Sequence, residues 1–442
     1  MRLAYVLIVY LLAPVVIAME AWKALWNPEY RGRLGQRLGF EGPRPPAPGL
    51  WLHAVSVGEV QAVAALVQAL RKLFPDLPVV LTTVTPTGAQ RARALFGESV
   101  LHCYLPYDLP GAVRRFLDRT QPRVAIIMET EIWPTLYHAL GKRGIPLVMA
   151  SARVSTRSVD RYRRLASLFR ETLSHGILIG AQTAADAERF RIIGAAADRV
   201  RVTGNVKYDM EIPAASVEAG RAFRARAAAA RPVWIAGSTH EGEEEAVLAA
   251  HSMVREHHPD ALLILVPRHP QRFESVRALL RRRGIVFAQH SSGEEPRPDH
   301  AVFLVDTLGE LQMFYAAADV AFVAGSLVPV GGHSLLEPAV LGLPMLSGPY
   351  NHNAQDVADL FEQCGALRIV RSKEGLAQKL CEWFDDPARA RADGEQGRQA
   401  VAQSRGAVTR LVAMVVPLLS RPAGSPGPGE PSAASSASSG SR

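Results

Sequence analysis

Residues 51–60 read Trp-Leu-His-Ala-Val-Ser-Val-Gly-Glu-Val, an apolar run that ends at Gly58 and is followed at once by the carboxylate of Glu59. Apolar side chains recur at helical spacing from Gly58 to Phe74, so the segment predicts a strand, a turn and a helix. Open α/β sheets bind their ligands where such a strand ends. Glu59 is therefore either a functional carboxylate or a first-turn glutamate that complements the helix dipole.

The same alternation of short apolar runs and helical segments continues along the chain, which indicates βαβ units and parallel sheets. The expected strands lie at 50–57, 79–84, 124–128, 146–150, 176–179, 200–203, 233–236, 261–266, 285–288, 302–305, 320–324 and 344–346. A chain of 442 residues exceeds one ordinary core. The predicted fold class is α/β, with two Rossmann-like domains facing across a cleft and an N-terminal membrane-anchor helix.

Composition divides the chain into six expected parts. The domains are residues 49–210 and residues 231–420, each Rossmann-like, with an interdomain linker at 211–230. A basic membrane-proximal segment and linker, residues 23–48, precedes them, and the membrane anchor is residues 1–22. The last part, residues 421–442, contains mostly Pro, Gly, Ser and Ala and is expected to be disordered.

The N-terminal run 3–19 is apolar, with Pro14 as its one interruption, and it approaches the roughly 20 residues that span a bilayer. A cleaved signal peptide, a spanning anchor and a helix lying in the interface are the alternatives. No small-residue cleavage site follows the run, which favours a retained anchor. Basic residues are more frequent after the run than before it, so the domains are expected on the cytoplasmic side.

Charge and motif content exclude several classes of function. The net charge of +8 favours acidic partners, namely nucleic acid, an anionic membrane or phosphorylated substrates. The three cysteines lie far apart without a Cys-x-x-Cys pair, so neither a disulfide framework nor a thiolate zinc site is expected. The sequence has no dinucleotide fingerprint, no Walker loop and no Gly-x-Ser-x-Gly elbow, which argues against hydride transfer, NTP hydrolysis and serine hydrolase chemistry.

Two segments of the second half are suited to phosphate. Arg268 follows the strand 261–266 and lies between two prolines, so its guanidinium emerges at the strand end, where it can clamp a phosphate. The loop 325–335 follows another strand and leads into a helix that begins near Glu337. We expect Gly331 and Gly332 to let backbone N–H groups approach an anion, and Glu337 to accept hydrogen bonds from ribose hydroxyls. A tight turn and a helix cap are the simpler alternatives.

The first half carries acidic and basic candidates. Glu129 and Glu131 follow the strand 124–128, and by alternation one of them points inward while the other is a solvated neighbour. Lys207, in the segment 204–209, either supplies a point charge to a leaving phosphate or is an ordinary surface lysine. The glutamates at 241–245 begin a helix and are expected to complement its dipole.

Together these segments resemble the lipid A 3-deoxy-D-manno-octulosonic acid (Kdo) transferases, membrane-anchored glycosyltransferases of the GT-B type. The resemblance extends over residues 1–415 in order. It rests on the apolar N-terminus, the basic segment ending at Phe40, and the segments 53–59, 82–88, 128–131, 204–207, 237–240, 267–269, 306–311 and 325–339.

The resemblance implies transfer of Kdo from CMP-Kdo to the lipid A precursor, lipid IVA, with inversion, at the cytoplasmic face of the inner membrane. It implies Glu59 as the general base, and Glu129 and Lys207 as groups that stabilise the transition state. It implies that the first domain binds the acceptor and the second the nucleotide sugar. The residues that it implies for binding the CMP moiety are Pro267, Arg268, Leu308, Gly309, Glu310, Ser334, Leu335, Leu336 and Glu337.

No metal, no cofactor and no nucleic acid are among the ligands implied; the donor substrate is CMP-Kdo. One segment departs from the family, which usually reads Gly-Gly-His-Asn-Pro-Leu-Glu where this chain has Ser334 and Leu335 in place of Asn-Pro. Ser334 is expected to cap the helix. The alternatives are another GT-B transferase that uses a UDP-sugar on a lipid acceptor, and a non-catalytic membrane-tethered protein that binds nucleotide or lipid.

Overall fold

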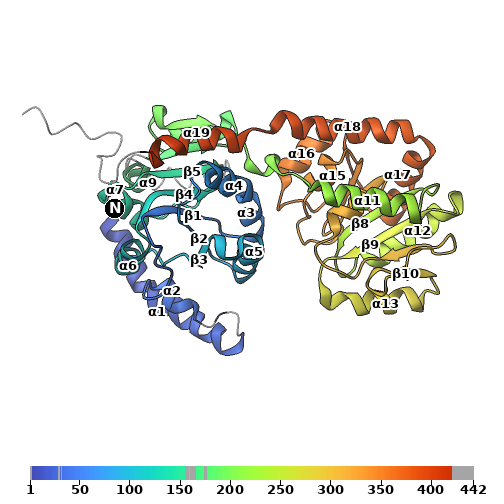
Figure 1. Ribbon diagram of the computed structural model, residues 1–442, viewed down its shortest axis with the longest axis horizontal. Coiled ribbons are helices and arrows are strands. Elements are labelled where there is room, and N and C mark those ends of the chain that lie inside the picture. Colours follow the sequence, from blue (N-terminus) through green and yellow to red (C-terminus); the bar gives the residue numbers. More distant parts are fainter. Residues whose placement is uncertain are drawn as a thin grey trace, which may run out of the picture. The chain divides into compact units, whose positions relative to one another are not determined.

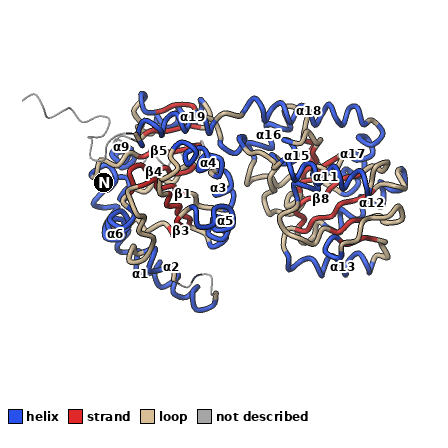
Figure 2. Tube along the Cα trace, viewed as in Figure 1, coloured by secondary structure: helices blue, strands red, loops and turns tan. Residues whose placement is uncertain are grey.

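The computed structural model describes residues 2–27, 30, 32–154, 159, 166–173 and 177–420. The tail predicted at 421–442 lies outside the described residues. The chain divides into two compact units, drawn as ribbons in Figure 1 and as a tube in Figure 2. Unit 1 comprises Met1–Asp209 with Arg405–Arg442, and unit 2 comprises Met210–Ser404.

Unit 1 is built on a sheet of seven parallel strands in the order β3-β2-β1-β4-β5-β6-β7. Both faces are covered by helices, and the central strands are accordingly apolar and buried along their length. Successive strands are added on one side of β1 up to β3 and on its other side from β4, so the direction of addition reverses between β1 and β4. The strands are β1 (Gly49–His53), β2 (Val79–Thr83), β3 (Leu101–Tyr104), β4 (Pro122–Met128), β5 (Leu147–Ala152), β6 (Leu178–Ala181) and β7 (Val200–Val202).

The helices of unit 1 connect these strands or precede them. The helix predicted at 58–74 is divided at Val63 into α3 and α4. The helices are α1 (Arg2–Trp26), α2 (Arg33–Arg37), α3 (Val57–Ala62), α4 (Ala64–Leu73), α5 (Pro86–Phe96), α6 (Pro110–Thr120), α7 (Pro134–Lys142), α9 (Ala166–Leu173), α10 (Ala184–Ile192) and α19 (Ala407–Leu419), with short 3-10 turns η2 (Gly97–Ser99), η3 (Ala197–Arg199) and η4 (Val206–Asp209).

Unit 2 repeats the design with seven parallel strands in the order β10-β11-β9-β8-β12-β13-β14. The direction of strand addition reverses here between β8 and β12. Its strands are β8 (Val233–Thr239), β9 (Leu262–Pro267), β10 (Phe287–Gln289), β11 (Val302–Leu304), β12 (Val320–Val323), β13 (Met345–Ser347) and β14 (Leu367–Ile369). Its helices are α11 (Ala214–Ala227), α12 (Glu244–His257), α13 (Phe273–Arg282), α14 (Leu311–Tyr315), α15 (Leu336–Val340), α16 (Gln355–Gln363), α17 (Lys373–Asp385) and α18 (Pro387–Ser404), with 3-10 turns η5 (Pro270–Arg272) and η6 (His290–Ser292).

The predicted fold class, α/β with two Rossmann-like domains, is confirmed. Two strands, β3 and β14, were not among those expected. Both are short edge strands with one neighbour each, and such strands carry little of the apolar pattern that identifies a buried strand.

Two expected boundaries differ from the structure. The linker expected at 211–230 is largely helix α11, which packs into unit 2 through Phe223 against Phe303 and Phe314. Residues 405–420, expected in the second domain, belong to unit 1. Figure 1 shows the red α19 against the blue and teal elements of unit 1.

Helix α19 belongs to unit 1 because both its start and its apolar face have partners there. The carboxylate of Asp209 accepts hydrogen bonds from the backbone N–H groups of Gly406 and Val408. Buried side chains of α19 join the core beside α4, β4 and β5. Leu411 is fully buried and lies over Gly180, where a Cβ atom would come within 2.9 Å of Leu411 Cδ2.

We predict that Leu411→Ala destabilises unit 1 by about 2–5 kcal/mol, because it leaves a cavity in a closely packed core. Hydrogen exchange measured by mass spectrometry reads the two units separately. Protection should fall in peptides that contain β1 and β4 and stay unchanged in those that contain β8 and β9. Leu73→Ala is the matched control, since Leu73 is 56% exposed. Equal loss of protection in both units would contradict the assignment of α19.

Candidate active site

Glu59 lies at the point in unit 1 where the direction of strand addition reverses. Strand β1 ends at His53, the turn 54–56 follows, and Glu59 occupies the first turn of α3. Its Oε2 accepts a hydrogen bond from the backbone N–H of Val55 at 2.9 Å, and its Oε1 accepts one from Ser56 Oγ at 3.2 Å. These contacts fix the carboxylate at the carboxyl end of β1.

Burial raises the pKa of the Glu59 carboxyl to about 7, because a half-buried carboxylate loses hydration. The hydrogen bond from Val55 opposes this shift, and the neighbouring negative charges of Glu129 and Glu131 reinforce it. A first-turn glutamate that only complemented a helix dipole would have a lowered pKa. The opposite shift favours a group that exchanges protons near neutral pH.

Glu129 follows β4, the strand next to β1 in the sheet. Its backbone is left-handed, with φ of 51°, a conformation that costs a residue with a Cβ atom on the order of 1 kcal/mol. Lys207 Nζ lies 2.8 Å from Glu129 Oε1 in an ion pair of which both side chains are partly exposed. The structure therefore brings Glu129 and Lys207 together. The two carboxyl groups that raise the pKa of Glu59, those of Glu129 and Glu131, both follow β4.

Neither Glu129 nor Glu131 is the fully solvated neighbour that the alternation predicted for one of the pair. Glu131 is partly buried, and burial raises its pKa. The alternation argument does not hold here because β4 ends at Met128 and the left-handed Glu129 turns the chain out of the strand. Glu59, Glu129 and Glu131 thus form an acidic group at one sheet edge.

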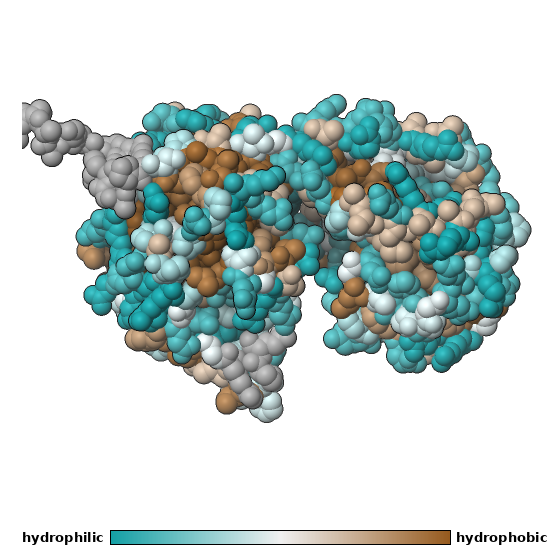
Figure 3. Space-filling view, in the orientation of Figure 1, coloured by the Kyte–Doolittle hydropathy of each residue, from teal (hydrophilic) through white to brown (hydrophobic). Residues whose placement is uncertain are grey.

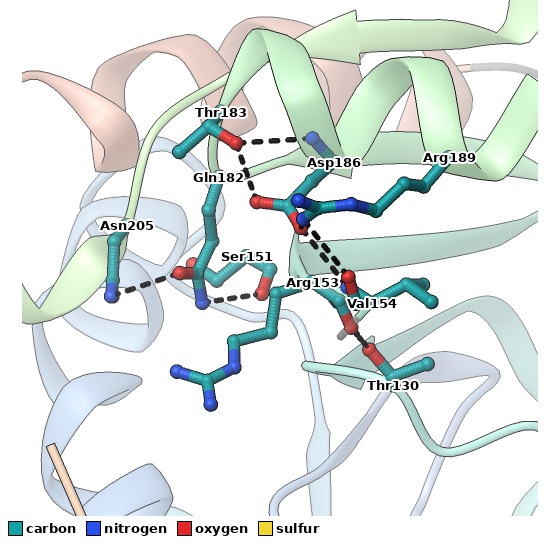
Figure 4. Close-up of polar contacts among 9 residues, drawn as sticks. All are labelled: Thr130, Ser151, Arg153, Val154, Gln182, Thr183, Asp186, Arg189 and Asn205. Atoms are coloured by element: carbon teal, nitrogen blue, oxygen red, sulfur yellow. Dashed lines mark hydrogen bonds and ion pairs between the residues drawn. The ribbon is translucent and has the colours of Figure 1, made fainter. Parts of the chain in front are cut away.

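A polar network fixes the backbone that carries Lys207, and Figure 4 shows its part from Asn205 through Gln182 to Ser151. Asn205 Oδ1 accepts a hydrogen bond from the Lys207 N–H, and Asn205 Nδ2 donates to Gln182 Oε1. Gln182 Nε2 donates in turn to the carbonyl of Ser151, whose hydroxyl accepts from the Val206 N–H. No local sequence pattern predicts this network, since its members come from the ends of β5, β6 and β7.

The second group of predicted residues lies in unit 2, after β9, β11 and β12. Pro267 ends β9, Arg268 is exposed directly after it, and Leu308 is 62% exposed in the loop after β11. Gly309 has φ of 90° in the same loop. Glu310 Oε1 and Oε2 both lie 3.2 Å from His290 Nε2.

The glycine loop after β12 is shaped differently from the prediction. The N–H groups of Gly331 and Gly332 both donate to the Gly325 carbonyl, at 3.1 and 2.8 Å, so they close the loop instead of pointing at an anion. Both glycines have positive φ, and a Cβ on Gly331 would lie 2.4 Å from Asn353 Nδ2. Glycine is therefore required here for the turn itself.

The helix after this loop also differs from its prediction. Leu335 is the residue that precedes α15, and no side chain caps that helix. Ser334 is exposed and does not act as the cap, whereas Leu335 and Leu336 are buried. Glu337, in the first turn, accepts a hydrogen bond from Gln312 Nε2 at 2.9 Å.

Glu243 plays a larger part than the dipole role predicted for it. Its fully buried carboxylate accepts hydrogen bonds from four backbone N–H groups, those of His240, Gly325, Ser326 and Leu327. Sequence reasoning could not find this because three of the four donors lie 82–84 residues away in the glycine loop. The contact ties the end of β8 to the start of the loop after β12.

Three imidazoles meet beside Arg268. His240 Nε2 and His333 Nε2 lie 2.8 Å apart, so one ring donates and the other accepts, and His269 packs edge-on against His240. Burial, together with the smaller effects of His240, Arg268 and His269, lowers the pKa of His333 to about 4. These neutral rings and the Arg268 guanidinium suit an anionic ligand. His240 and His269 each follow a strand, and this placement was the sequence signal that could have identified the histidine cluster.

Within the described ranges, no group of three or more His, Cys, Asp or Glu side chains is arranged to hold a metal ion.

Comparison with known proteins gives consistent matches. The family model described as 3-deoxy-D-manno-octulosonic-acid transferase (kdotransferase) matches residues 32–210. A 3-deoxy-D-manno-octulosonic acid transferase of Haemophilus influenzae is 37% identical over 95% of this chain and 99% of its own length. One of Bordetella pertussis is 39% identical over 91% of this chain and 97% of its own length.

Among solved structures, the UDP-GlcNAc 2-epimerase of Neisseria meningitidis covers 84% of this chain and 100% of its own, with a TM-score of 0.56 and 15% identity. At that identity the likeness shows the fold alone.

The raised pKa of Glu59 predicts how stability depends on pH. The contribution of the neutral carboxyl is fully present below the ordinary value of 4.5 and is lost as pH rises through about 7. Glu59→Gln, which stays neutral, should therefore be more stable than the natural protein at pH 8, by on the order of 1 kcal/mol, and equal to it near pH 4.5. Thermal unfolding at both pH values measures this. The exposed Glu98→Gln is the control, and a pH-independent difference for Glu59→Gln would contradict the shift.

Proposed function

This chain belongs to the 3-deoxy-D-manno-octulosonic acid (Kdo) transferase family of glycosyltransferases, and we propose that it transfers Kdo from CMP-Kdo to the lipid A precursor, lipid IVA, in lipopolysaccharide biosynthesis. The transfer inverts the configuration of the anomeric carbon. The observation that carries the proposal is the Glu59 carboxyl, held at the sheet edge with a pKa of about 7.

Glu59 acts as the general base. A base is most effective when its pKa lies near the working pH, because enough of it is ionised while it still accepts a proton strongly. The ionised carboxylate takes the proton from a sugar hydroxyl of the acceptor as that oxygen bonds to the anomeric carbon of Kdo. The bond from that carbon to the phosphate oxygen of CMP breaks at the same time, and CMP leaves as an anion.

Glu129 and Lys207 stabilise the transition state as a pair. Lys207 brings a positive charge to the edge where Glu59 works, and the 2.8 Å contact with Glu129 orients it. The network through Asn205 and Gln182 holds the backbone of Lys207 in place. Because this charge is already in place, it stabilises the negative charge that develops on the leaving group without any rearrangement.

Unit 2 supplies the groups for the donor. The exposed Arg268 faces the CMP phosphate, because guanidinium groups bind phosphate through paired, charge-assisted hydrogen bonds. His240, His269 and His333 offer neutral N–H donors beside it. Pro267, Leu308, Gly309 and Glu310 contribute the remaining contacts at the ends of β9 and β11.

The residues after β12 complete this donor site, with Glu337 accepting from the ribose. Leu335 and Leu336 are buried and pack under the loop, whereas Ser334 is exposed to solvent. The exposed Arg268 provides the positive charge that the leaving phosphate requires, so the proposal includes no metal and no cofactor.

The protein acts at the cytoplasmic face of the inner membrane. Helix α1 is long and apolar enough to cross a membrane by length and composition, and none of it is buried inside the protein. This supports attachment through α1. An enzyme with a net charge of +8 also suits an anionic lipid acceptor and an anionic donor.

The test is transfer by the purified full-length protein. With lipid IVA and CMP-Kdo, we expect CMP release and a lipid product heavier by one or more Kdo units in the mass spectrum. Glu59→Gln should lower turnover by roughly 10²–10⁴-fold, the usual contribution of a positioned acid or base. CMP should still bind this variant, because Glu59 does not contact the donor nucleotide in the proposal.

Two comparisons make the result specific. Glu98→Gln, an exposed glutamate of the same unit, should leave turnover unchanged. UDP-sugars in place of CMP-Kdo should give no product. Transfer from a UDP-sugar, or near-normal turnover in Glu59→Gln, would overturn the donor or the role of the base, respectively.

A further inference from the structure

Helix α1 has two different faces. One carries large apolar side chains four or seven residues apart, all at least 57% exposed, namely Leu3, Leu7, Leu11, Val15, Trp22 and Trp26. Figure 3 shows tan and brown residues along the margin where Figure 1 draws α1 in dark blue. The other face packs against α2 and α7 of unit 1. The exposed stripe has no partner among the described residues.

Polar contacts hold both ends of α1 against unit 1. Near its start, Tyr5 donates a hydrogen bond to Asp108 Oδ2 at 2.8 Å, and Arg2 pairs with Glu171 at 3.8 Å. Asp108 is itself fixed, because it accepts hydrogen bonds from the Thr135 and Leu136 N–H groups. The N-terminal half of the helix is therefore attached to the folded unit, not only joined to it by the chain.

Arg33, in the basic membrane-proximal segment expected at 23–48, holds the other end and is buried. It is 3% exposed, lies between the rings of Tyr30 and Tyr104, and donates from Nη2 to the Val84 carbonyl at 2.6 Å. Its Nη1 lies 3.9 Å from Glu20 Oε2 on α1. A buried arginine of unit 1 thus anchors the C-terminal half of α1.

These attachments are incompatible with a helix that crosses the membrane. Tyr5 and Glu20 are 15 positions apart, or about 22 Å along a helix, against a hydrocarbon core of roughly 30 Å. If α1 crossed the bilayer with both contacts intact, Asp108 and the folded backbone beside it would enter the hydrocarbon. Charged groups and irregular backbone exposed to lipid at that depth cost several kcal/mol each.

We infer that α1 lies in the plane of one leaflet, with its apolar stripe in the acyl chains and its other face on unit 1. A helix with one apolar face that lies in the interface sinks about 5–10 Å into the boundary between headgroups and acyl chains. Trp22 and Trp26 suit that boundary. The occupant of the stripe is therefore lipid, and both ends of α1 stay on the side of the folded units.

The placement has a consequence for the acceptor, which rests on the proposed function. Arg33 bonds to the carbonyl after β2, and Asp108 follows β3, so α1 runs beside the carboxyl ends of these strands. Glu59 follows β1 at the same edge of the sheet. A lipid whose acyl chains lie in the leaflet under α1 would present its sugar at this edge without leaving the membrane.

Depth measurements on the full-length protein test the placement directly. Nitroxide labels go on single cysteines in Leu3→Cys, Leu11→Cys and Trp22→Cys, with the native cysteines replaced by Cys103→Ala, Cys364→Ser and Cys381→Ser. Electron paramagnetic resonance in vesicles of phosphatidylethanolamine and phosphatidylglycerol gives each label's depth. We expect three depths within about 5 Å of one another, near the interface. Leu73→Cys, on the surface of unit 1, should read as water-exposed.

Reactivity in native membranes gives a second readout. The cysteine of Arg2→Cys, on the face of α1 that meets unit 1 and not in the apolar stripe, should react with an impermeant maleimide from the same side as that of Glu211→Cys, an exposed position of unit 2. A label at position 11 that lies about 10 Å or more deeper than those at 3 and 22, or reaction from opposite sides, would show that α1 spans. Labels in water, or an intact mass that lacks α1, would also overturn the inference. None of these readouts depends on Kdo transfer.

Discussion

The reversal of strand addition beside the first strand of each sheet is the constraint on which the candidate sites depend. In unit 1 the chain leaves β1 and β4 towards opposite faces, so the ends of these neighbouring strands are not covered by one another's helices, and Glu59 and Glu129 occupy that opening. In unit 2 the same arrangement at β8 and β12 brings His240 beside the glycine loop. The candidate residues of each unit lie where its strand order reverses.

Within that opening, the opposing effects on Glu59 decide its role. Its hydrogen bonds from Val55 and Ser56 are those of a residue at a helix start, and alone they would keep it ionised. Burial and the negative charges of Glu129 and Glu131 outweigh them and move the pKa to about 7. Lys207 pairs with Glu129, so the acidic group keeps one positive charge within it. The two roles considered for Glu59, a glutamate at a helix start and a functional carboxylate, are thus compatible. The contacts that hold it at the helix start also orient its carboxylate.

Features that depend on local sequence patterns could be predicted from the sequence. Features that depend on contacts with residues distant along the chain could not. Apolar runs identified the central strands, and the residues after them, including Glu59, Glu129 and Arg268, lie at strand ends as predicted. The packing of α19 on unit 1 and the burial of Arg33 depend on tertiary contacts that no local pattern records. The sequence predicts that the N–H groups of the glycine loop bind an anion, but Gly331 and Gly332 use their N–H groups to close the turn.

The most direct test of the central claim is the pH dependence of kcat/KM for transfer from CMP-Kdo to lipid IVA. A base must be ionised to act, so kcat/KM should rise with pH through an apparent pKa of about 7 and level off above it. Glu98→Gln should follow the same curve, and the residual activity of Glu59→Gln should lose the inflection. A profile with no inflection between about pH 5.5 and 8.5, or one retained in Glu59→Gln, would contradict Glu59 as the base.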